Sequence, residues 1–136
     1  MEGVTANRAR IQKRAYMNSY EERWHEAGSL QDGNGASSLV QDLHGAWEVQ
    51  RLTGLVPMRG LYKTVEGNSG ATGATWSPFP DFGFRLEQLD GSVLLTYNRP
   101  LSSMKDEFRK EADGCWLGRA RVAGKQYAWF RMVPYR

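Results

Sequence analysis

The chain has 136 residues, a hydrophobic fraction of 40% and a formal net charge of +3, which fit a single domain with its own core. Its one cysteine, Cys115, excludes an internal disulfide and a cysteine-based zinc site. No stretch approaches the roughly 18 apolar residues of a membrane span, and residues 1–30 lack the apolar core of a secretory leader, so a cytoplasmic location is expected.

An amphipathic helix is predicted over residues 6–27. Its apolar stripe consists of Ile11, Ala15, Tyr20, Trp24 and Ala27. Basic residues near its start and acidic residues near its end oppose the helix dipole, so this helix should need a surface on which to dock. The trailing acids disfavour an anionic bilayer, and packing on the rest of the chain is therefore expected.

A flexible connection is predicted from Gly28 to Ser38, where glycine, aspartate and asparagine gather. From Leu39 onward apolar residues recur with a period of two, which is typical of strands with one buried face. The chain is therefore divided into residues 1–38, the helix and its connection, and residues 39–136, a β-domain.

Short turns join most of the predicted strands. Asp90-Gly91, Asp113-Gly114 and Ala123-Gly124-Lys125 are typical hairpin connections. The expected strands are Leu43–Gln50, Met58–Val65, Phe82–Leu89, Val93–Asn98, Asp106–Ala112, Cys115–Val122 and Gln126–Val133. A flat sheet of this size would leave an exposed edge, so the fold class is predicted to be mainly β, a single closed antiparallel barrel of about seven or eight strands.

The segment from Glu66 to Asp81 departs from this pattern. It is rich in glycine, serine, threonine and proline, and it contains Trp76 and Phe79. Long loops in compact domains are uncommon and are often functional. Two interpretations stay open, a lid over the barrel mouth and a mobile hairpin that carries one irregular strand.

Gly45-Ala46-Trp47 resembles the Gly-x-Trp start of lipocalin-like barrels. In those folds the tryptophan closes one end of the barrel and an arginine from the last strand packs across it. The resemblance implies that Arg131 takes this position against Trp47, where a guanidinium can stack on the indole face.

Four further segments resemble a bacterial family that pairs a Gly-x-Trp-x-Gly segment with a C-terminal domain of unknown function. They are Tyr97-Asn98-Arg99-Pro100-Leu101, Asp106-Glu107-Phe108-Arg109, Asp113-Gly114 and Leu117-Gly118-Arg119-Ala120. The resemblance covers about residues 43–133. This chain departs from the family at Val49, which replaces the second glycine, and at Asn98, which replaces an acid. The family implies a lipocalin-like barrel and names no reaction.

Acid–base chemistry is the reaction type that the sequence allows. No metal site or cofactor is expected, because His25 and His44 lie far apart and no phosphate-binding loop or nucleophile elbow is present. Strand parity places Asp106 inside with Phe108, where a carboxylate would have a raised pKa. Asp106, Tyr97 and Lys63 are the candidate catalytic residues. The alternative is that Asp106 caps a turn or pairs with a strand arginine.

The chain holds five tryptophans, six tyrosines and five phenylalanines, enough to line a ligand pocket. The expected ligand-binding residues are Trp47, Tyr62, Trp76, Phe84, Trp116, Trp129 and Arg131. The alternation of side chains along the strands places five residues on the inward face, namely Trp47, Phe84, Tyr97, Trp116 and Trp129.

Three functions stay open. A cofactor-free cyclase or isomerase that acts on a polyketide-like or terpenoid-like molecule of secondary metabolism is slightly favoured. A carrier of an apolar metabolite is the alternative, and a basic interaction module comes last. The expected partner is a small apolar organic molecule, with no nucleic acid and no membrane, and a homodimer is an open possibility.

Overall fold

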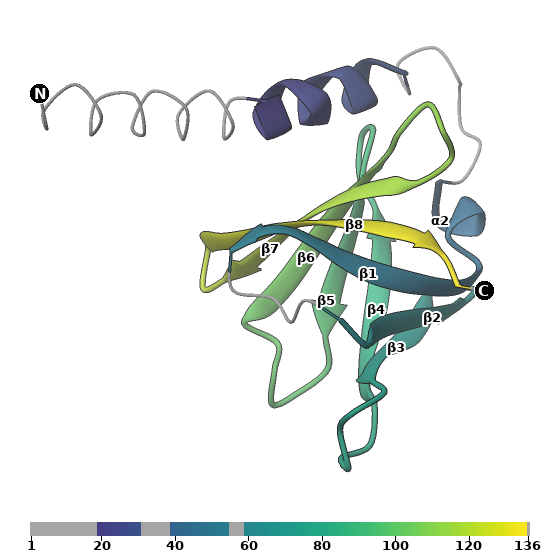
Figure 1. The fold of residues 1–136 in the computed structure, drawn as a ribbon, viewed down its shortest axis with the longest axis vertical. Coiled ribbons are helices and arrows are strands. Elements are labelled where there is room, and N and C mark those ends of the chain that lie inside the picture. Colours follow the sequence, from purple (N-terminus) through teal and green to yellow (C-terminus); the bar gives the residue numbers. More distant parts are fainter. Residues whose placement is uncertain (1–18, 31–38, 55–58, 136) are drawn as a thin grey trace, which may run out of the picture.

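Eight antiparallel strands form a closed barrel in this computed structural model, which describes residues 19–30, 39–54 and 59–135. Each strand pairs with the next in sequence, and β8 pairs with β1 to close the ring (Figure 1). The elements are a helix over residues 19–30, α2 (Leu39–Asp42), β1 (Gly45–Gly54), β2 (Leu61–Glu66), β3 (Ser69–Ala74), β4 (Phe82–Gln88), β5 (Val93–Tyr97), β6 (Met104–Lys110), β7 (Trp116–Val122) and β8 (Lys125–Pro134). The predicted fold class is confirmed.

The hairpin turns form where Asp-Gly pairs interrupt the alternating pattern. Gly91 and Gly114 have φ values of 76° and 84°, in the left-handed region that glycine adopts without strain. The start of the β-domain differs from the prediction. Leu39–Asp42 is a short helix, and the first strand begins only at Gly45.

The N-terminal helix runs beyond its predicted end at Ala27, so Gly28 to Leu30 are helical rather than part of the connection. The predicted helical residues 6–18, the rest of the connection and Met58 lie outside the described residues. No helix in the described ranges is both long enough and apolar enough to cross a membrane.

β3 is a regular strand inside the segment expected to be a loop. It pairs with β2 from Glu66↔Ser69 to Leu61↔Ala74 and with β4 on its other side. A lid that spans Glu66–Asp81 is therefore wrong for the first half of this segment, and only residues 75–81 connect β3 to β4. The glycines of β3 serve close packing, since a Cβ on Gly70 would lie 2.7 Å from Cζ of Phe84.

One end of the barrel is filled by side chains. Trp47 is buried there, and its indole N–H donates a hydrogen bond of 2.7 Å to the carbonyl oxygen of Leu43. The core around Trp47 includes Leu39, Leu43, Val65, Phe84, Leu86, Val93, Leu95, Phe108, Trp116 and Met132. Arg131 does not pack across Trp47. It lies between the inward-facing Phe130 and Met132, so it faces outward and pairs with Asp113.

The helix over residues 19–30 docks on the outer wall of the barrel (Figure 1). Tyr20 and Trp24 pack there with Leu117 and Trp129. The guanidinium carbons of Arg109 and Arg119 lie 4.5 Å and 4.3 Å from the centre of the Trp24 ring. The helix thus covers a side wall and not the barrel mouth.

Candidate functional site

A cavity of about 300 Å³ occupies the other half of the barrel interior. At this end β1, β3, β5 and β7 finish and β2, β4, β6 and β8 begin. The lining residues are Val49, Leu61, Lys63, Thr72, Phe82, Tyr97, Leu101, Met104, Asp106, Ala120, Tyr127 and Phe130. A volume of this order is at the lower end of the range for small-molecule sites. Its walls are mainly apolar.

Lys63, Thr72, Tyr97 and Asp106 form a buried polar cluster in this cavity. The Nζ atom of Lys63 lies 3.1 Å from Oδ2 of Asp106. It also donates hydrogen bonds of 2.8 Å to the Thr72 hydroxyl and 2.8 Å to the Tyr97 hydroxyl. The three sequence-predicted candidate residues, Lys63, Tyr97 and Asp106, are therefore brought together.

Strand pairing explains how the cluster assembles. Lys63 and Thr72 are direct partners across β2 and β3, and Asp106 pairs with Leu95 on β5. In a closed ring of eight strands, β2 and β6 face each other across the interior. The Lys63–Asp106 pair thus spans the barrel between the cavity and the filled end, and it forms a polar floor.

The environment fixes the protonation of two members of the cluster. Burial alone would lower the pKa of Lys63, but Tyr97 and Asp106 outweigh it and raise that pKa above its ordinary value. Burial raises the pKa of Tyr97, and the opposing charge of Lys63 does not cancel this effect. Lys63 is therefore a fixed cation, and Tyr97 is a neutral phenol with a proton to donate.

Asp106 neither caps a turn nor pairs with a strand arginine, because its partner is a lysine from the opposite wall. The strand arginine pairs instead with the next residue. Arg119 lies 2.9 Å from Glu107 on the outer face, where Ser92 also donates a hydrogen bond of 2.7 Å to the Glu107 carboxylate. The predicted parity of β6 is thus correct for both side chains.

Tyr127 is a cavity residue that the sequence analysis missed. Ala120 pairs with Ala128 and Arg121 with Gln126, so Tyr127 is the extra residue of a β-bulge in β8. A bulge re-aims the local side chain, and here the ring lines the cavity. Burial, followed by the charge of Asp106, raises the pKa of Tyr127 to about 12. Its hydroxyl forms no hydrogen bond to another described residue.

The seven expected ligand-binding residues lie outside the cavity lining. Trp47, Phe84 and Trp116 belong to the filled core beneath it. Trp129 faces outward under the helix, so its predicted inward direction is wrong. Tyr62 is on the outer surface, where its hydroxyl donates to Asp81 at 3.0 Å. Arg131 is also outside, and Trp76 lies on the β3–β4 loop with 63% of its surface exposed.

No protein-family model matches this chain, and no curated protein sequence matches it.

Proposed function

We propose that the protein binds a small, mainly apolar organic molecule in the barrel cavity and acts on it as a cofactor-free isomerase or cyclase. The observation that carries this proposal is the convergence of Lys63, Tyr97 and Asp106 on the floor of an otherwise apolar cavity. Buried charged groups with perturbed pKa values that face a cleft are candidates for functional sites. An inward carboxylate beside aromatic rings favours catalysis over passive carriage.

The cavity volume limits the size of the ligand. A cavity of about 150 Å³ admits benzene, so about 300 Å³ accommodates a molecule of roughly one to two rings. This size fits a small terpenoid-like or polyketide-like compound.

The charge of the floor limits the polarity of the ligand. Because Asp106 already balances Lys63, a ligand carboxylate would add an uncompensated charge in a buried site. The polar group of the ligand is therefore neutral, such as a ketone.

Tyr127 and Asp106 supply a route for the reaction. A ketone oxygen accepts a hydrogen bond from the Tyr127 hydroxyl, and Asp106 removes a proton from the adjacent carbon. Hydrogen bonds from the Tyr127 and Tyr97 hydroxyls, together with the Lys63 cation, stabilise the negative charge that develops on the oxygen. Return of the proton to another carbon completes an isomerisation. In a cyclase the enolate carbon attacks a second carbonyl, and the proton passes to the new alkoxide. Neither route requires an oxidant or a reductant.

A carrier is the second candidate, and a specific observation favours it. Lys63, Thr72, Tyr97 and Asp106 satisfy one another by hydrogen bonds without a ligand. In a carrier, this network would have the purely structural role of holding the barrel in one conformation. The resemblance to the bacterial Gly-x-Trp-x-Gly family belongs to both candidates, since it implies a lipocalin-like barrel and no reaction.

Native mass spectrometry of protein purified from its own host tests the binding half of the proposal. We expect a bound neutral organic molecule. Ala120, which lines the cavity and is 2% exposed, offers a blocking variant. Ala120→Leu should remove the bound molecule, whereas Ala112→Leu at an exposed turn should retain it. Retention in Ala120→Leu would place the ligand elsewhere.

The same molecule tests the catalytic half. Incubated with the wild-type protein in D₂O, it should exchange its acidic C–H protons or convert to an isomer or ring-closed product. Asp106→Asn and Tyr97→Phe, assayed where both are folded, should slow this conversion by about 10²-fold or more. Asp90→Asn, an exposed turn residue, is the matched control. Tight binding without exchange in the wild type would leave the carrier.

A further inference from the structure

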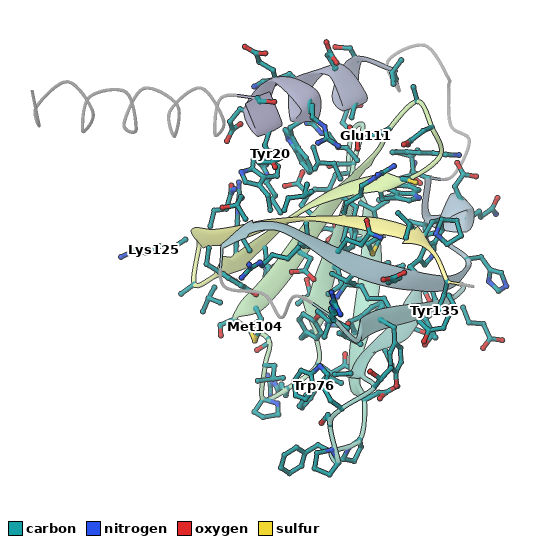
Figure 2. All side chains as sticks on the ribbon, in the orientation of Figure 1. Tyr20, Trp76, Met104, Glu111, Lys125 and Tyr135 are labelled. Carbon is teal, nitrogen blue, oxygen red and sulfur yellow. The ribbon has the colours of Figure 1, made fainter. Side chains whose placement is uncertain are left out.

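Three aromatic side chains are exposed at the open end of the barrel. Trp76 is 63% exposed, Phe79 is 71% exposed and Phe82 is 51% exposed. Trp76 and Phe79 lie on residues 75–81, the loop that extends from the bottom of the barrel in Figure 2. Large apolar side chains that cluster on a protruding loop indicate a contact surface.

This aromatic rim is continuous with the cavity. Phe82 belongs to both, since its ring lines the cavity and half of its surface is exposed. Leu101 and Met104, from the β5–β6 connection and the start of β6, line the cavity at the same end. Anything that covers the rim therefore faces the cavity entrance.

Basic residues flank the rim on both sides. The carbonyl oxygen of Arg59 accepts a hydrogen bond of 3.0 Å from the Trp76 indole. Arg99 follows Asn98, whose backbone N–H donates to the carbonyl oxygen of Gly83 at 3.0 Å, next to Phe82. Both arginines are exposed.

Positive charge extends over the whole open end of the barrel. Lys105, Arg121 and Lys125 also lie at this end, and none of the five basic residues forms a salt bridge within the described part of the chain. Asp81 is the acidic residue of the β3–β4 loop. Acidic residues at the opposite end include Asp42, Glu66, Asp90, Glu111 and Asp113, of which Asp42 and Asp113 pair with Lys110 and Arg131.

We propose that this open end docks on an anionic lipid bilayer, with Trp76 and Phe79 at the headgroup level. Tryptophan and phenylalanine insert at membrane interfaces, and arginine and lysine beside them are attracted to anionic headgroups. Lysine is depleted at protein–protein interfaces, so Lys105 and Lys125 at this end favour a bilayer over a protein partner. The expectation of no membrane concerned only the N-terminal helix, whose trailing acidic residues disfavour an anionic bilayer.

Docking goes beyond the proposed function and does not depend on it. If the cavity also binds an apolar molecule, the molecule passes between bilayer and cavity without crossing water. The binding of vesicles is measured on ligand-free protein, whereas ligand binding and turnover are measured without vesicles. Failure of one proposal is therefore distinguishable from failure of the other.

Intrinsic fluorescence provides a local readout. Trp24, Trp47, Trp116 and Trp129 are between 0% and 8% exposed, so Trp76 is the one exposed tryptophan among the five. Vesicles of phosphatidylcholine with phosphatidylglycerol should shift the emission to the blue, and vesicles of phosphatidylcholine alone should shift it much less. Added salt should reverse the shift, because it screens the exposed arginines and lysines.

Co-sedimentation with the same vesicles tests the residues. Trp76→Ser with Phe79→Ser should weaken binding by at least about tenfold. Arg59→Gln with Arg99→Gln should weaken it by roughly 30-fold, at about fivefold per basic residue. Leu89→Ser and Arg85→Gln are matched controls, since Leu89 is exposed at the opposite end and Arg85 lies on the outer wall.

Three results would overturn the proposal. The first is that the wild type does not bind the anionic vesicles, and the second is that the control variants lose as much binding as the rim variants. The third is a dimer in solution that the rim substitutions dissociate, without vesicle binding. That result would assign the surface to a second copy of the chain.

Discussion

The ammonium group of Lys63 lies 3.1 Å from a carboxylate oxygen of Asp106, and the two side chains are 2% and 5% exposed. They come from β2 and β6, on opposite sides of the barrel. Burying two charges costs free energy that their attraction only partly offsets, so a pair of this kind does not by itself stabilise a fold. It does hold the two walls in a fixed relation at the cavity floor.

Removal of one partner should therefore be far worse than removal of both. We expect Asp106→Asn to lower the free energy of unfolding by about 3–5 kcal/mol, because Lys63 is left buried without a counter-charge. The double variant Lys63→Met with Asp106→Leu should recover most of this loss. Urea unfolding measures both, with Asp90→Asn as the control. A double variant as unstable as the single one would show that the pair itself stabilises the barrel.

Stability should fall in alkaline solution. The pKa of Tyr127 is raised to about 12 in the folded protein, against 10.0 for an ordinary tyrosine. Between these values the unfolded chain releases a proton that the folded chain keeps, so the free energy of unfolding decreases as the pH rises from about 10. The raised pKa values of Tyr97 and Lys63 act in the same direction.

Urea unfolding between about pH 9 and about pH 11 measures this dependence. In Tyr127→Phe the decrease should be shallower than in the wild type. Tyr135→Phe, which removes an exposed phenol just past the other end of β8, is the control. Identical slopes in Tyr127→Phe and the wild type would contradict the burial of this hydroxyl.

Trp24 should determine whether the N-terminal helix stays docked. Its side chain is 2% exposed and contacts Arg109 and Arg119 of the barrel wall. Trp24→Ala should cost about 3–5 kcal/mol and should make the helix sensitive to limited proteolysis. Glu22→Ala, on the exposed side of the helix, should change neither measurement. A protected helix in Trp24→Ala would mean that other contacts hold it.

Gly118 should not tolerate even a methyl group. A Cβ at this position would overlap the Phe130 ring and would lie 3.0 Å from Cδ1 of Phe108. Gly118→Ala should therefore destabilise the barrel by about 1–3 kcal/mol in thermal or urea unfolding. In a Phe130→Leu background the same substitution should cost less, because the overlapping ring is gone. Equal costs in both backgrounds would contradict the overlap as the cause.

The barrel could be predicted because most strands alternate large apolar side chains with polar ones and end at Asp-Gly turns. β3 could not, since Ser69, Gly70, Ala71, Thr72, Gly73 and Ala74 include no large apolar side chain. The need for glycine and alanine there arises from neighbours that the sequence does not place, such as the Phe84 ring against Gly70.

The candidate site was predictable where strand parity is regular. Parity alone places Asp106 inside, and the structure places Lys63 and Tyr97 against it. Tyr127 was missed because a bulge shifts the phase of β8 by one residue. Trp129 was misplaced because burial under a helix and burial inside a barrel give the same apolar pattern in sequence.

Trp129 and Phe130 are consecutive residues of β8, yet one contacts the N-terminal helix and the other lines the cavity. The helix and the cavity are thus separated by the thickness of a single strand. We expect a ligand that repositions Phe130 to disturb the contact between Trp129 and Trp24 as well, whose ring centres lie 5.8 Å apart. In that case helix docking and cavity occupancy would be thermodynamically linked, and each would change the equilibrium of the other by the same free energy.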